Sequence, residues 1–535
     1  MHRHGILVYF VLLSILTSVT AFSQTQKFAL NVKDYGAAGD GVVMDGPAIQ
    51  KAIDHCARSG GTVYLPPGIY LSGSLELKSN VTLHISAGAT LLGSADIADY
   101  REYLPDEPSY NDAFLRHSLL YAENAENISV TGRGVIDGQG GKFVVKTKKK
   151  PDRYKNRPYV IRFVKCRNVL VENIRLQNSA MWMQQYFVCQ DVVIRGINVY
   201  NHCNKNNDMI DIDGCKNVVI SDCIGDTDDD ALTIKSTSGH ISENITVTNC
   251  VLSSHCNAIK LGTESHGGFK NIVISNIVVK PSAHPTKIYG HLQGISGITL
   301  GLVDGGILEG VQISNIRIDG PRVPIYMRLG DRGRTYTANQ KRPEVGIFRD
   351  VMISNILATG ADTIGCSITG LEDRNMHDIA LTKIRIVFNG GGKVYPPGKN
   401  VPELRDHYPE STKFGALPAY GFYLRHISGL RLSDIELSYQ SDDERCAIMA
   451  EYVRDLDITD LRALSGTVNK SLLHLNNAQH AYISGSRALN ETDFFLKLSG
   501  KKSENIILND NYSTHISNMI LRDKEVMEGA VRFEE

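Results

Sequence analysis

The chain has 535 residues, of which 42% are hydrophobic and 21% charged, so it is long enough for two or three ordinary domains or one large elongated domain. Lysine and arginine (57) nearly balance aspartate and glutamate (58), and the formal net charge of −1 excludes a global field that would favour nucleic acid or a membrane surface. Glycine is abundant (48 residues) and proline modest (17), which favours many turns over long helices.

The chain begins with MHRHGILVYFVLLSILTSVTAFSQ, a short basic start followed by an apolar run and then small residues around Ala21 and Ser23. This order is typical of a secretory signal peptide, and we expect residues 1–23 to be removed. A membrane anchor is the alternative, although the apolar run is barely long enough to span a bilayer. We therefore expect a secreted or periplasmic protein that has no membrane contact after cleavage.

Residues 24–95 predict an N-terminal cap and the first coils of a larger array. FALNVKDYGAAGDG predicts a strand and a glycine-rich turn, and DGPAIQKAIDHCARSGG predicts a helix with Pro47 in its first turn and Gly60 after its end. A cap would cover the open first coil, whose unpaired edge would otherwise invite aggregation. We find no linker further on, so we expect residues 24–535 to form one domain, with loops inserted into one coil at 385–425.

A repeat runs through the middle of the chain. Each copy starts with Asn or Asp, has Val or Ile at +1 and +3, and has Ile or Cys at +6. Successive copies are 23, 26, 27 and 27 residues apart, and they read NVLVENI (168–174), DVVIRGI (191–197), NVVISDC (217–223), NITVTNC (244–250) and NIVISNI (271–277). Related phrases follow at 310–316, 350–356, 378–384 and 429–435.

This alternation with β-branched residues indicates short strands, and the fixed spacing indicates stacked units. We therefore predict an all-β fold, a single-stranded parallel β-helix in which identical positions lie about 4.8 Å apart. The leading Asn side chains would form a ladder, and the Ile, Val and Cys positions an inward column. A leucine-rich solenoid is the rival repeat, but its Leu-rich phrase is absent.

Cys166, Cys189 and Cys215 each precede a leading Asn or Asp by two residues. A stack of buried thiols is the favoured interpretation, and a disulfide is the alternative that export permits. The chain has no CxxC pair, so a zinc site has little support.

The stretch DTDDD at 226–230 is the most acidic in the chain, and Asp208 precedes Asp229 and Asp230 by 21 and 22 residues, about one coil. Stacking would bring the three carboxylates to one face. Crowding should raise at least one pKa, so that one acid stays protonated beside ionised neighbours. Cleavage of a glycosidic bond needs this division between an acid and a base or nucleophile.

Two other interpretations of this acidic stretch stay open. The stretch does not match an EF-hand calcium loop, because Ala231 stands where the loop needs Gly and Thr237 where it needs Glu. A calcium site of another kind and a solvated acidic turn are both possible. Consecutive strand residues face opposite sides, so Asp229 and Asp230 can share a cleft only at a bend.

The ordered motifs NNDMIDIDG, DTDDDALTIKS and HCNAIKLGTES resemble the active-site series of glycoside hydrolase family 28, the polygalacturonases and rhamnogalacturonan hydrolases. Asn206 and Asp208 match the family's Asn-x-Asp, Asp229 and Asp230 its Asp pair, and His255 the His of its Gly-His-Gly, with Ser254 and Cys256 in place of the glycines. The phrases DYGAAGDG and GRGVIDGQG also resemble the family, and the likeness is good over 28–280 and weak beyond.

The resemblance implies a right-handed parallel β-helix and hydrolysis with inversion of configuration. Asp229 would be the general acid, Asp208 and Asp230 would hold and deprotonate the attacking water, and His255 would tune the acid or touch the substrate. Such a mechanism needs no metal and no organic cofactor.

The chain departs from the family where an Arg-x-Lys pair is expected, because the corresponding coil reads GISGITLGLVDGG (294–306). In the family these cations contact a uronate carboxylate. The candidate replacements in substrate binding, with Asn206 beside them, are Lys235, Lys260, Arg328, Arg332 and Arg334, and surface ion pairs are the alternative role for each.

The loop KFVVKTKKKPDRYKNRP (142–158) carries eight Lys or Arg and one Asp. It could steer an acidic polysaccharide toward the protein, or it could be a solvated loop. Nucleic acid is a weaker candidate because no aromatic residues interleave with the basic run. Trp182 is the only tryptophan, so tyrosines would have to supply sugar-stacking surfaces.

These observations favour a secreted glycoside hydrolase that acts on a pectin-type polysaccharide or oligosaccharide, such as a galacturonan or rhamnogalacturonan. A polysaccharide lyase of the same fold, with calcium held by Asp and an Arg or Lys as base, is one alternative. A non-catalytic glycan-binding β-helix is the other.

Overall fold

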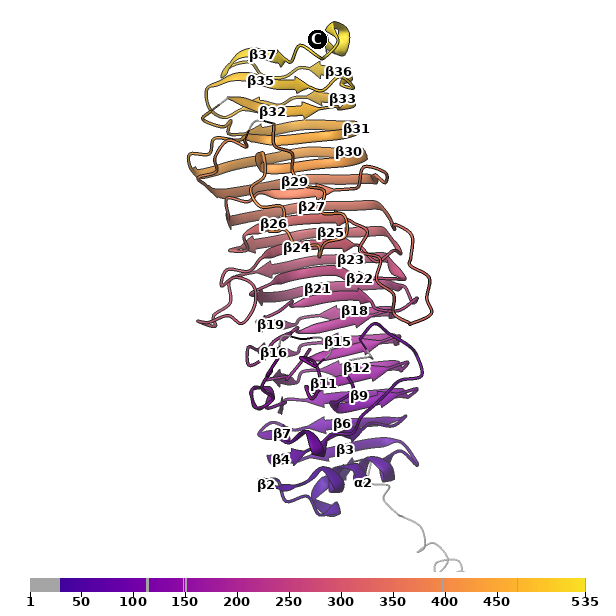
Figure 1. Cartoon of the computed structure of the whole chain (residues 1–535). Helices are drawn as coiled ribbons and strands as arrows, with labels where there is room; N and C mark the ends of the chain where they lie inside the picture. The colour runs from indigo at the N-terminus through magenta and orange to yellow at the C-terminus, as the bar shows by residue number, and fades with distance from the viewer. Residues whose placement is uncertain are drawn as a thin grey trace, which may run out of the picture.

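The computed structural model describes residues 29–111, 115–147, 149, 152–396, 398–468 and 470–534. They form an elongated stack of coils, with the N-terminal helix at one end and the C-terminus at the other (Figure 1). The named strands pair in parallel from coil to coil, each with its counterpart one turn of chain away. The fold is a right-handed parallel β-helix, the hand that parallel crossover connections adopt.

The stack has three faces. Face 1 contains β5 (Leu75–Glu76), β8 (Ser118–Glu123), β11 (Tyr159–Val164), β14 (Gln184–Phe187), β17 (Ile210–Asp213), β20 (Leu232–Ser236), β22 (Asn257–Ser265), β24 (Ser296–Leu302), β26 (Val323–Leu329), β28 (Cys366–Thr369), β32 (Ser471–Asn476), β35 (Thr492–Ser499) and β37 (Ile516–Arg522). Face 2 contains β1 (Ala29–Asn31), β3 (Gly61–Leu65), β6 (Val81–Ile85), β9 (Glu126–Gly132), β12 (Arg167–Glu172), β15 (Gln190–Arg195), β18 (Lys216–Ser221), β33 (Gln479–Ser484), β36 (Glu504–Asn509) and β38 (Val531–Glu534). Face 3 contains β2 (Asp40–Met44), β4 (Gly68–Ser72), β7 (Ala89–Gly93), β10 (Val135–Asp137), β13 (Arg175–Gln177), β16 (Asn198–Asn201), β19 (Ile224–Thr227) and β34 (Arg487–Ala488).

Longer strands continue from one face to the next in the second half of the stack. Those that join faces 2 and 3 are β21 (Ser242–Ser254), β23 (Gly268–Val279), β25 (Ile307–Asp319), β27 (Ile347–Ala361) and β29 (Met376–Gly390). All three faces are joined in β30 (Ala419–Ser441) and β31 (Cys446–Ala463). The predicted repeats at 168–174, 191–197, 217–223, 244–250 and 271–277 lie on β12, β15, β18, β21 and β23, which confirms their interpretation as strands.

Along the strands of face 1, side chains point alternately into the hydrophobic core and outward from the stack. One column points inward and is fully buried: Tyr186, Ile212, Ile234, Leu261 and Leu300, paired in register. Each such side chain stabilises the fold by roughly 1.5–3 kcal/mol through burial. The neighbouring column points outward and is polar, with Gln185, Asp211, Thr233 and Lys260 in register. Face 1 therefore presents polar groups on a rigid sheet.

The predicted ladder of leading asparagines is confirmed. Asn168 donates to Asn127 (2.8 Å), Asn244 to Asn217 (3.1 Å) and Asn271 to Asn244 (3.2 Å). All of these residues have a positive φ, between 53° and 57°, a left-handed conformation that asparagine tolerates better than most residues. The motif also builds a second ladder five residues later, which the sequence analysis did not predict; there Asn355 donates to Asn315 (3.0 Å) and Asn315 to Asn276 (3.2 Å).

The helix predicted after residue 45 is α2 (Gly46–Cys56), with Pro47 in its first turn as expected. It lies at the N-terminal end of the stack (Figure 1), beside the 3-10 helix η1 (Val32–Tyr35). Its role as a cap stays a prediction. The other 3-10 helices are η2 (Ile97–Asp99), η3 (Gly140–Lys142) and η4 (Glu528–Ala530). The predicted signal peptide lies outside the described residues. Within the part of the chain that the structure covers, no helix has both the length and the apolar character needed to cross a membrane.

The ten cysteines are all free thiols, which confirms the buried-thiol interpretation of the column. Cys166, Cys189 and Cys215 are at most 1% exposed, and the thiols of Cys189 and Cys215 donate to backbone carbonyls of the preceding coil. Burial raises the pKa of the Cys189 thiol well above its usual value. These cysteines therefore pack as small apolar side chains.

Four long loops leave the coils and return over face 1. They are the segment before β8, the loop between η3 and β11, residues 280–295 between β23 and β24, and residues 391–418 between β29 and β30. The last of these lies inside the segment 385–425 that the sequence predicts as inserted loops. The four loops supply much of the wall of the site described next.

Candidate active site

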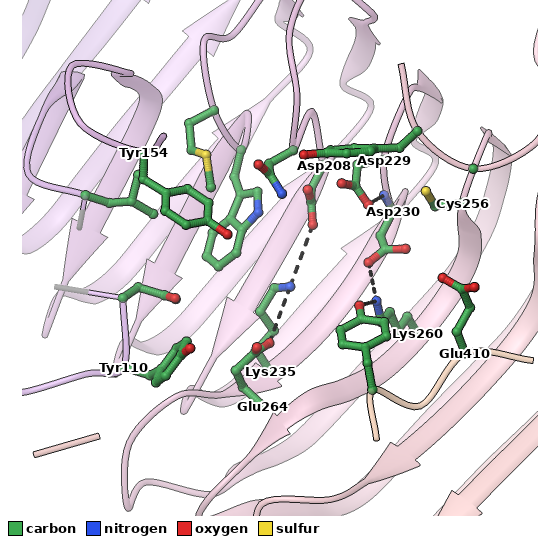
Figure 2. A pocket seen from close by; sticks show the side chains of 18 of the residues that line it. Tyr110, Tyr154, Asp208, Asp229, Asp230, Lys235, Cys256, Lys260, Glu264 and Glu410 are labelled. Atoms are coloured by element: carbon green, nitrogen blue, oxygen red, sulfur yellow. Dashed lines mark hydrogen bonds and ion pairs between the residues drawn. The ribbon is translucent and has the colours of Figure 1, made fainter. Parts of the chain in front are cut away.

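A cleft of about 600 Å³ opens on face 1 in the middle of the stack. Strands β17, β20 and β22 and the turns before them form its floor, and the four loops form its walls. The wall residues are Tyr110, Asn111, Leu115, Arg153, Tyr154, Tyr289, Gly290, Tyr408 and Glu410. Figure 2 shows Tyr110 and Tyr154 on one side of the carboxylates and Glu410 on the opposite side.

Asp208, Asp229 and Asp230 all line this cleft, as the sequence predicts. Asp208 lies two residues before β17, and the Asp pair ends two residues before β20, one coil later. The backbone N–H of Met209 donates to the carbonyl of Asp230 (3.0 Å), which ties the two turns together. The chain bends at 228–229, and this bend lets two consecutive carboxylates reach one cleft.

The environments of the two neighbouring aspartates differ strongly. Burial opposes ionisation of Asp230, but Lys260 and Lys235 outweigh it and lower the pKa of this carboxyl. Lys260 Nζ lies 2.6 Å from one carboxylate oxygen, and the other accepts from the side chain (2.6 Å) and backbone N–H (3.1 Å) of Asn257. Burial and the Asp230 charge raise the pKa of Asp229 to about 6.

Asp208 is buried beside another carboxylate. Burial, Asp211 and Asp229 together raise the pKa of Asp208 well above its usual value, although Lys235 Nζ lies 3.6 Å away and opposes the rise. Its Oδ1 is buried and accepts no hydrogen bond from the described residues. Asp211, the second residue of β17, lies 3.3 Å from Lys235. Burial raises the pKa of Asp211 to about 8, although Lys235 opposes the rise.

Four of the five predicted substrate-binding cations line the cleft, and one does not. Lys235, Lys260 and Arg332 are cleft residues, and so is Arg334. Arg328 is 2% exposed and is absent from the lining, because it donates to the Thr369 hydroxyl (3.1 Å) and to the carbonyls of Glu403 and Leu404. It holds the 391–418 loop to the stack, so the structure does not place it for substrate binding.

The structure also places His255 behind the cleft wall. The ring is fully buried and does not line the cleft, and its Nδ1 lies 3.0 Å from Asp228. The same carboxylate accepts the backbone N–H groups of Ile288 (2.6 Å) and Tyr289 (2.9 Å). His255 and Asp228 therefore anchor the 280–295 loop, which carries Tyr289 into the cleft, and direct substrate contact by His255 has no support here.

Asn206 lines the cleft, and its Oδ1 accepts from Arg157 (3.3 Å). Several cleft residues were not predicted as site residues: Tyr110, Arg153, Tyr289, Tyr408, Glu264 and Glu410. Glu264 follows Lys260 on β22 at an outward position, so strand periodicity could have found it. The loop residues had no periodic signal, although the basic composition of 142–158 did mark the loop that carries Arg153.

The alternating carboxylates of the DTDDD stretch do not converge on one point. Asp226 pairs with His202 (2.9 Å) and the backbone N–H of Ala283, Asp228 pairs with His255, and Asp230 lines the cleft. Two groups of the described residues have ligand atoms close enough for a cation: His202, Asp228 and His255, and Asp229, Asp230 and Cys256. In the first group, Asp228 already accepts hydrogen bonds from the 280–295 loop. In the second group, Asp230 already pairs with Lys260. These two carboxylates thus already have other partners, whereas His202 Nδ1 and His255 Nε2 are buried and have no hydrogen-bond partner among the described residues.

The family model described as glycosyl hydrolases family 28 matches residues 62–404. The chain is 32% identical over 214 residues to a probable polygalacturonase of Vitis vinifera (38% of this chain, 43% of the relative). It is 28% identical over 272 residues to an exo-poly-alpha-D-galacturonosidase of Dickeya chrysanthemi (42% and 44%) and 30% identical over 230 residues to rhamnogalacturonase A of Emericella nidulans (42% and 40%). The chain thus spans less than half the length of these curated relatives.

Solved structures agree on the fold. The crystal structure of a hyperthermoactive exopolygalacturonase from Thermotoga maritima matches with a TM-score of 0.56 and 25% identity, over 67% of this chain and 87% of that one. A polygalacturonase from Erwinia carotovora matches with a TM-score of 0.50 and 20% identity, over 75% and 93% of the two chains. The second likeness supports the β-helix alone.

Proposed function

Because the chain belongs to glycosyl hydrolases family 28, we propose that it hydrolyses glycosidic bonds of acidic, pectin-type polysaccharides or oligosaccharides with inversion of configuration. The observation that carries the proposal is the cleft lined by Asp208, Asp229 and Asp230, two of which have pKa values shifted in opposite directions. Inverting hydrolysis needs one protonated and one ionised carboxyl in the same cleft.

In this mechanism Asp229 protonates the glycosidic oxygen, since a pKa of about 6 keeps it protonated in mildly acidic solution. Asp230 is held ionised by Lys260 and takes a proton from the attacking water. Asp208 offers its unoccupied Oδ1 to the same water and fixes its position. The base role thus rests on Asp230 more than on Asp208, whose raised pKa makes it a poorer proton acceptor.

The remaining groups act by position. His255 works through Asp228 on the 280–295 loop, and Asn206 is held by Arg157 beside Asp208. Lys235, paired with Asp208 and 4.4 Å above the Trp182 ring, sets the charge at the floor of the cleft. Proton transfers among carboxyl groups account for the reaction without a metal or an organic cofactor.

Incubating the protein with homogalacturonan, rhamnogalacturonan and a neutral glycan tests the proposal. We expect new reducing ends from an acidic glycan, with the first product in the inverted anomeric form by NMR. Asp229→Asn should lower the rate by about 10²–10⁴-fold, because it removes the proton donor and little else. Circular dichroism and Tm of the variant serve as the control for folding, and full activity of Asp229→Asn would contradict the assignment.

The same incubation separates the two alternatives. A lyase would release an unsaturated, ultraviolet-absorbing product and would stop when a chelator removes calcium. A binding module would retain the glycan and release no reducing ends. Either result would replace the hydrolase proposal.

A further inference from the structure

The cations of the cleft are almost all committed to carboxylates. Lys235 pairs with Asp208, Asp211 and Glu264 at 3.6, 3.3 and 3.9 Å, and Lys260 pairs with Asp230 at 2.6 Å. Arg332 and Arg334 share Asp304, and Arg334 also pairs with Glu264 (2.7 Å). These pairs are mostly buried, so the positive charge of these four cations is already largely balanced by protein carboxylates.

Arg153 is different from these four. Its guanidinium donates to the Tyr154 hydroxyl (2.5 Å) and lies 4.5 Å from the centre of the Tyr154 ring. Within the described residues it forms no ion pair with a carboxylate, and its buried Nε has no hydrogen-bond partner. The adjacent Asp152 pairs with Lys155 instead (3.0 Å).

The loop that carries Arg153 is fastened to the active site by Arg157. Arg157 is 3% exposed and donates to the carbonyls of Ala180 (2.9 Å) and Arg153 (3.3 Å) and to Asn206 Oδ1 (3.3 Å). The backbone of Arg153 is therefore held next to the Asn-x-Asp turn. A preorganised loop loses little entropy when ligand binds.

Arg153 also faces the opposite loop. Burial raises the pKa of the Tyr289 hydroxyl to about 12, and Arg153 is the strongest of the effects that oppose this rise. The guanidinium thus lies against the Tyr154 ring and within electrostatic reach of Tyr289 on the 280–295 loop. Five acidic side chains line the same cleft, namely Asp208, Asp229, Asp230, Glu264 and Glu410, so an acidic sugar needs an uncommitted cation to enter.

We propose that Arg153 binds the carboxylate of the sugar acid in this cleft and thereby determines that the enzyme accepts acidic rather than neutral or esterified units. This inference rests on the proposed function. The missing Arg-x-Lys pair is thus replaced by a residue of the basic loop 142–158, from another coil. A guanidinium presents two parallel N–H donors that match a carboxylate, which a lysine cannot do.

The test compares Arg153→Gln and Arg153→Lys with the matched control Lys155→Gln, a change of charge on the same loop at a side chain that is 61% exposed. Kinetics are measured on oligogalacturonides and on their methyl esters. We expect Arg153→Gln to raise KM for the acid by about 10–100-fold, as for loss of a charge-assisted bidentate contact, with a smaller change in kcat. KM of Arg153→Gln for the ester should stay within about twofold of the wild-type value. KM of Arg153→Lys for the acid should lie between those of the wild type and Arg153→Gln, and Lys155→Gln should have the KM of the wild type.

An unchanged preference for acid over ester in Arg153→Gln would overturn the inference while leaving the proposed hydrolase intact. Absence of turnover by the wild type would instead defeat the proposed function, and calorimetry with trigalacturonate would then still decide whether binding requires Arg153. If Arg153→Gln fails to fold, Arg153→Lys decides the matter, since equal KM for the acid in wild type and Arg153→Lys would exclude bidentate recognition.

Discussion

At the scale of single residues, the pair Asp229 and Asp230 shows how one turn can hold two carboxyls whose pKa values are shifted in opposite directions. Both carboxyls are largely buried, and burial alone would raise both pKa values. Of the two carboxyls, Lys260 contacts only Asp230, so the ionised form of Asp230 is stabilised, and its charge then raises the pKa of Asp229. One lysine thus separates the roles of two adjacent carboxyls.

This arrangement predicts the pH dependence of kcat/KM. Asp229 must be protonated and Asp230 ionised, so activity should fall as pH rises through about 6 and as pH falls below the lowered pKa of Asp230, which is under 3.8. We therefore expect a bell-shaped profile on the acidic side of neutrality, measured on a soluble oligosaccharide. An optimum above pH 7 would contradict the assigned acid.

Replacing Lys260 should move this profile in a defined direction. Lys260→Met removes the cation that lowers both carboxyl pKa values, so both limbs should shift to higher pH. The acid limb should move further, by about 1–3 pH units, because Lys260 contacts Asp230 directly. Lys155→Gln provides the control for a change of charge outside the cleft. A profile that keeps its acid limb in Lys260→Met would show that another group sets it.

At the scale of elements, the asparagine ladder couples an unusual backbone conformation to contacts between coils. Asn271 has φ 53° and donates to Asn244, while Gly310 occupies the equivalent place in the next coil with φ 67°. Glycine adopts this conformation without strain, whereas a β-branched residue does so at a cost of about 1–2 kcal/mol. Substitutions at Asn271 can therefore separate the contribution of the left-handed backbone from that of the side-chain hydrogen bond.

Asn271→Val should lower the free energy of unfolding by about 2–3 kcal/mol, since it introduces backbone strain and removes a hydrogen bond worth about 1 kcal/mol. Asn271→Gly should lose only about 1 kcal/mol, because it keeps the backbone relaxed. Midpoints of denaturant unfolding, followed by circular dichroism, measure both changes. Equal losses in the two variants would mean that the left-handed backbone contributes nothing.

The repeat unit could be predicted from sequence because each strand copies the same alternation. Val169 and Val171 on β12 correspond to Val192 and Ile194 on β15, and this likeness is visible in the letters alone. The second ladder was missed because its residues vary more, with Asp222, Lys383 and Gly485 beside the asparagines. What these share is a positive φ, which several residue types can adopt.

At the scale of the whole molecule, the floor of the candidate active site was predictable and its walls were not. Asp208 and the Asp229–Asp230 step lie one coil apart, so stacking alone brings them together. The walls are formed by loops whose positions over face 1 depend on individual contacts between residues far apart in the sequence. For example, Tyr408 reaches Lys260 across 148 residues of sequence (3.1 Å), and no periodic pattern encodes that distance. For His255 the family motif suggested that the side chain tunes the acid or touches the substrate, and its complete burial argues against the second role alone.

The four loops together limit how a polymer can enter the cleft. The segment before β8 reaches the segments that follow β20 and β26, where Tyr110 N–H donates to the carbonyl of Thr237 (2.9 Å) and its ring lies 3.9 Å from the Arg334 guanidinium. The 391–418 loop folds back over several coils, and Ser411 bonds Ser296 (2.8 Å). With the other two loops these segments enclose the carboxylates from several directions, which favours a chain end over the middle of a chain.

We therefore expect exo-type action, in which each cleavage releases a short product from an end of the glycan. On homogalacturonan, reducing ends should accumulate while viscosity falls little, and early digests should contain one short product in place of a ladder of sizes. Removing the wall should change this pattern: replacing residues 405–411 with a short Gly-Ser linker opens the side of the cleft where Tyr408 and Glu410 lie. Long substrates should then gain access relative to short ones, although Lys260 loses its Tyr408 contact and the overall rate should drop. A wild-type digest that already shows intermediates of all lengths would mean that the loops leave the groove open along the stack, so that the cleft accepts internal bonds.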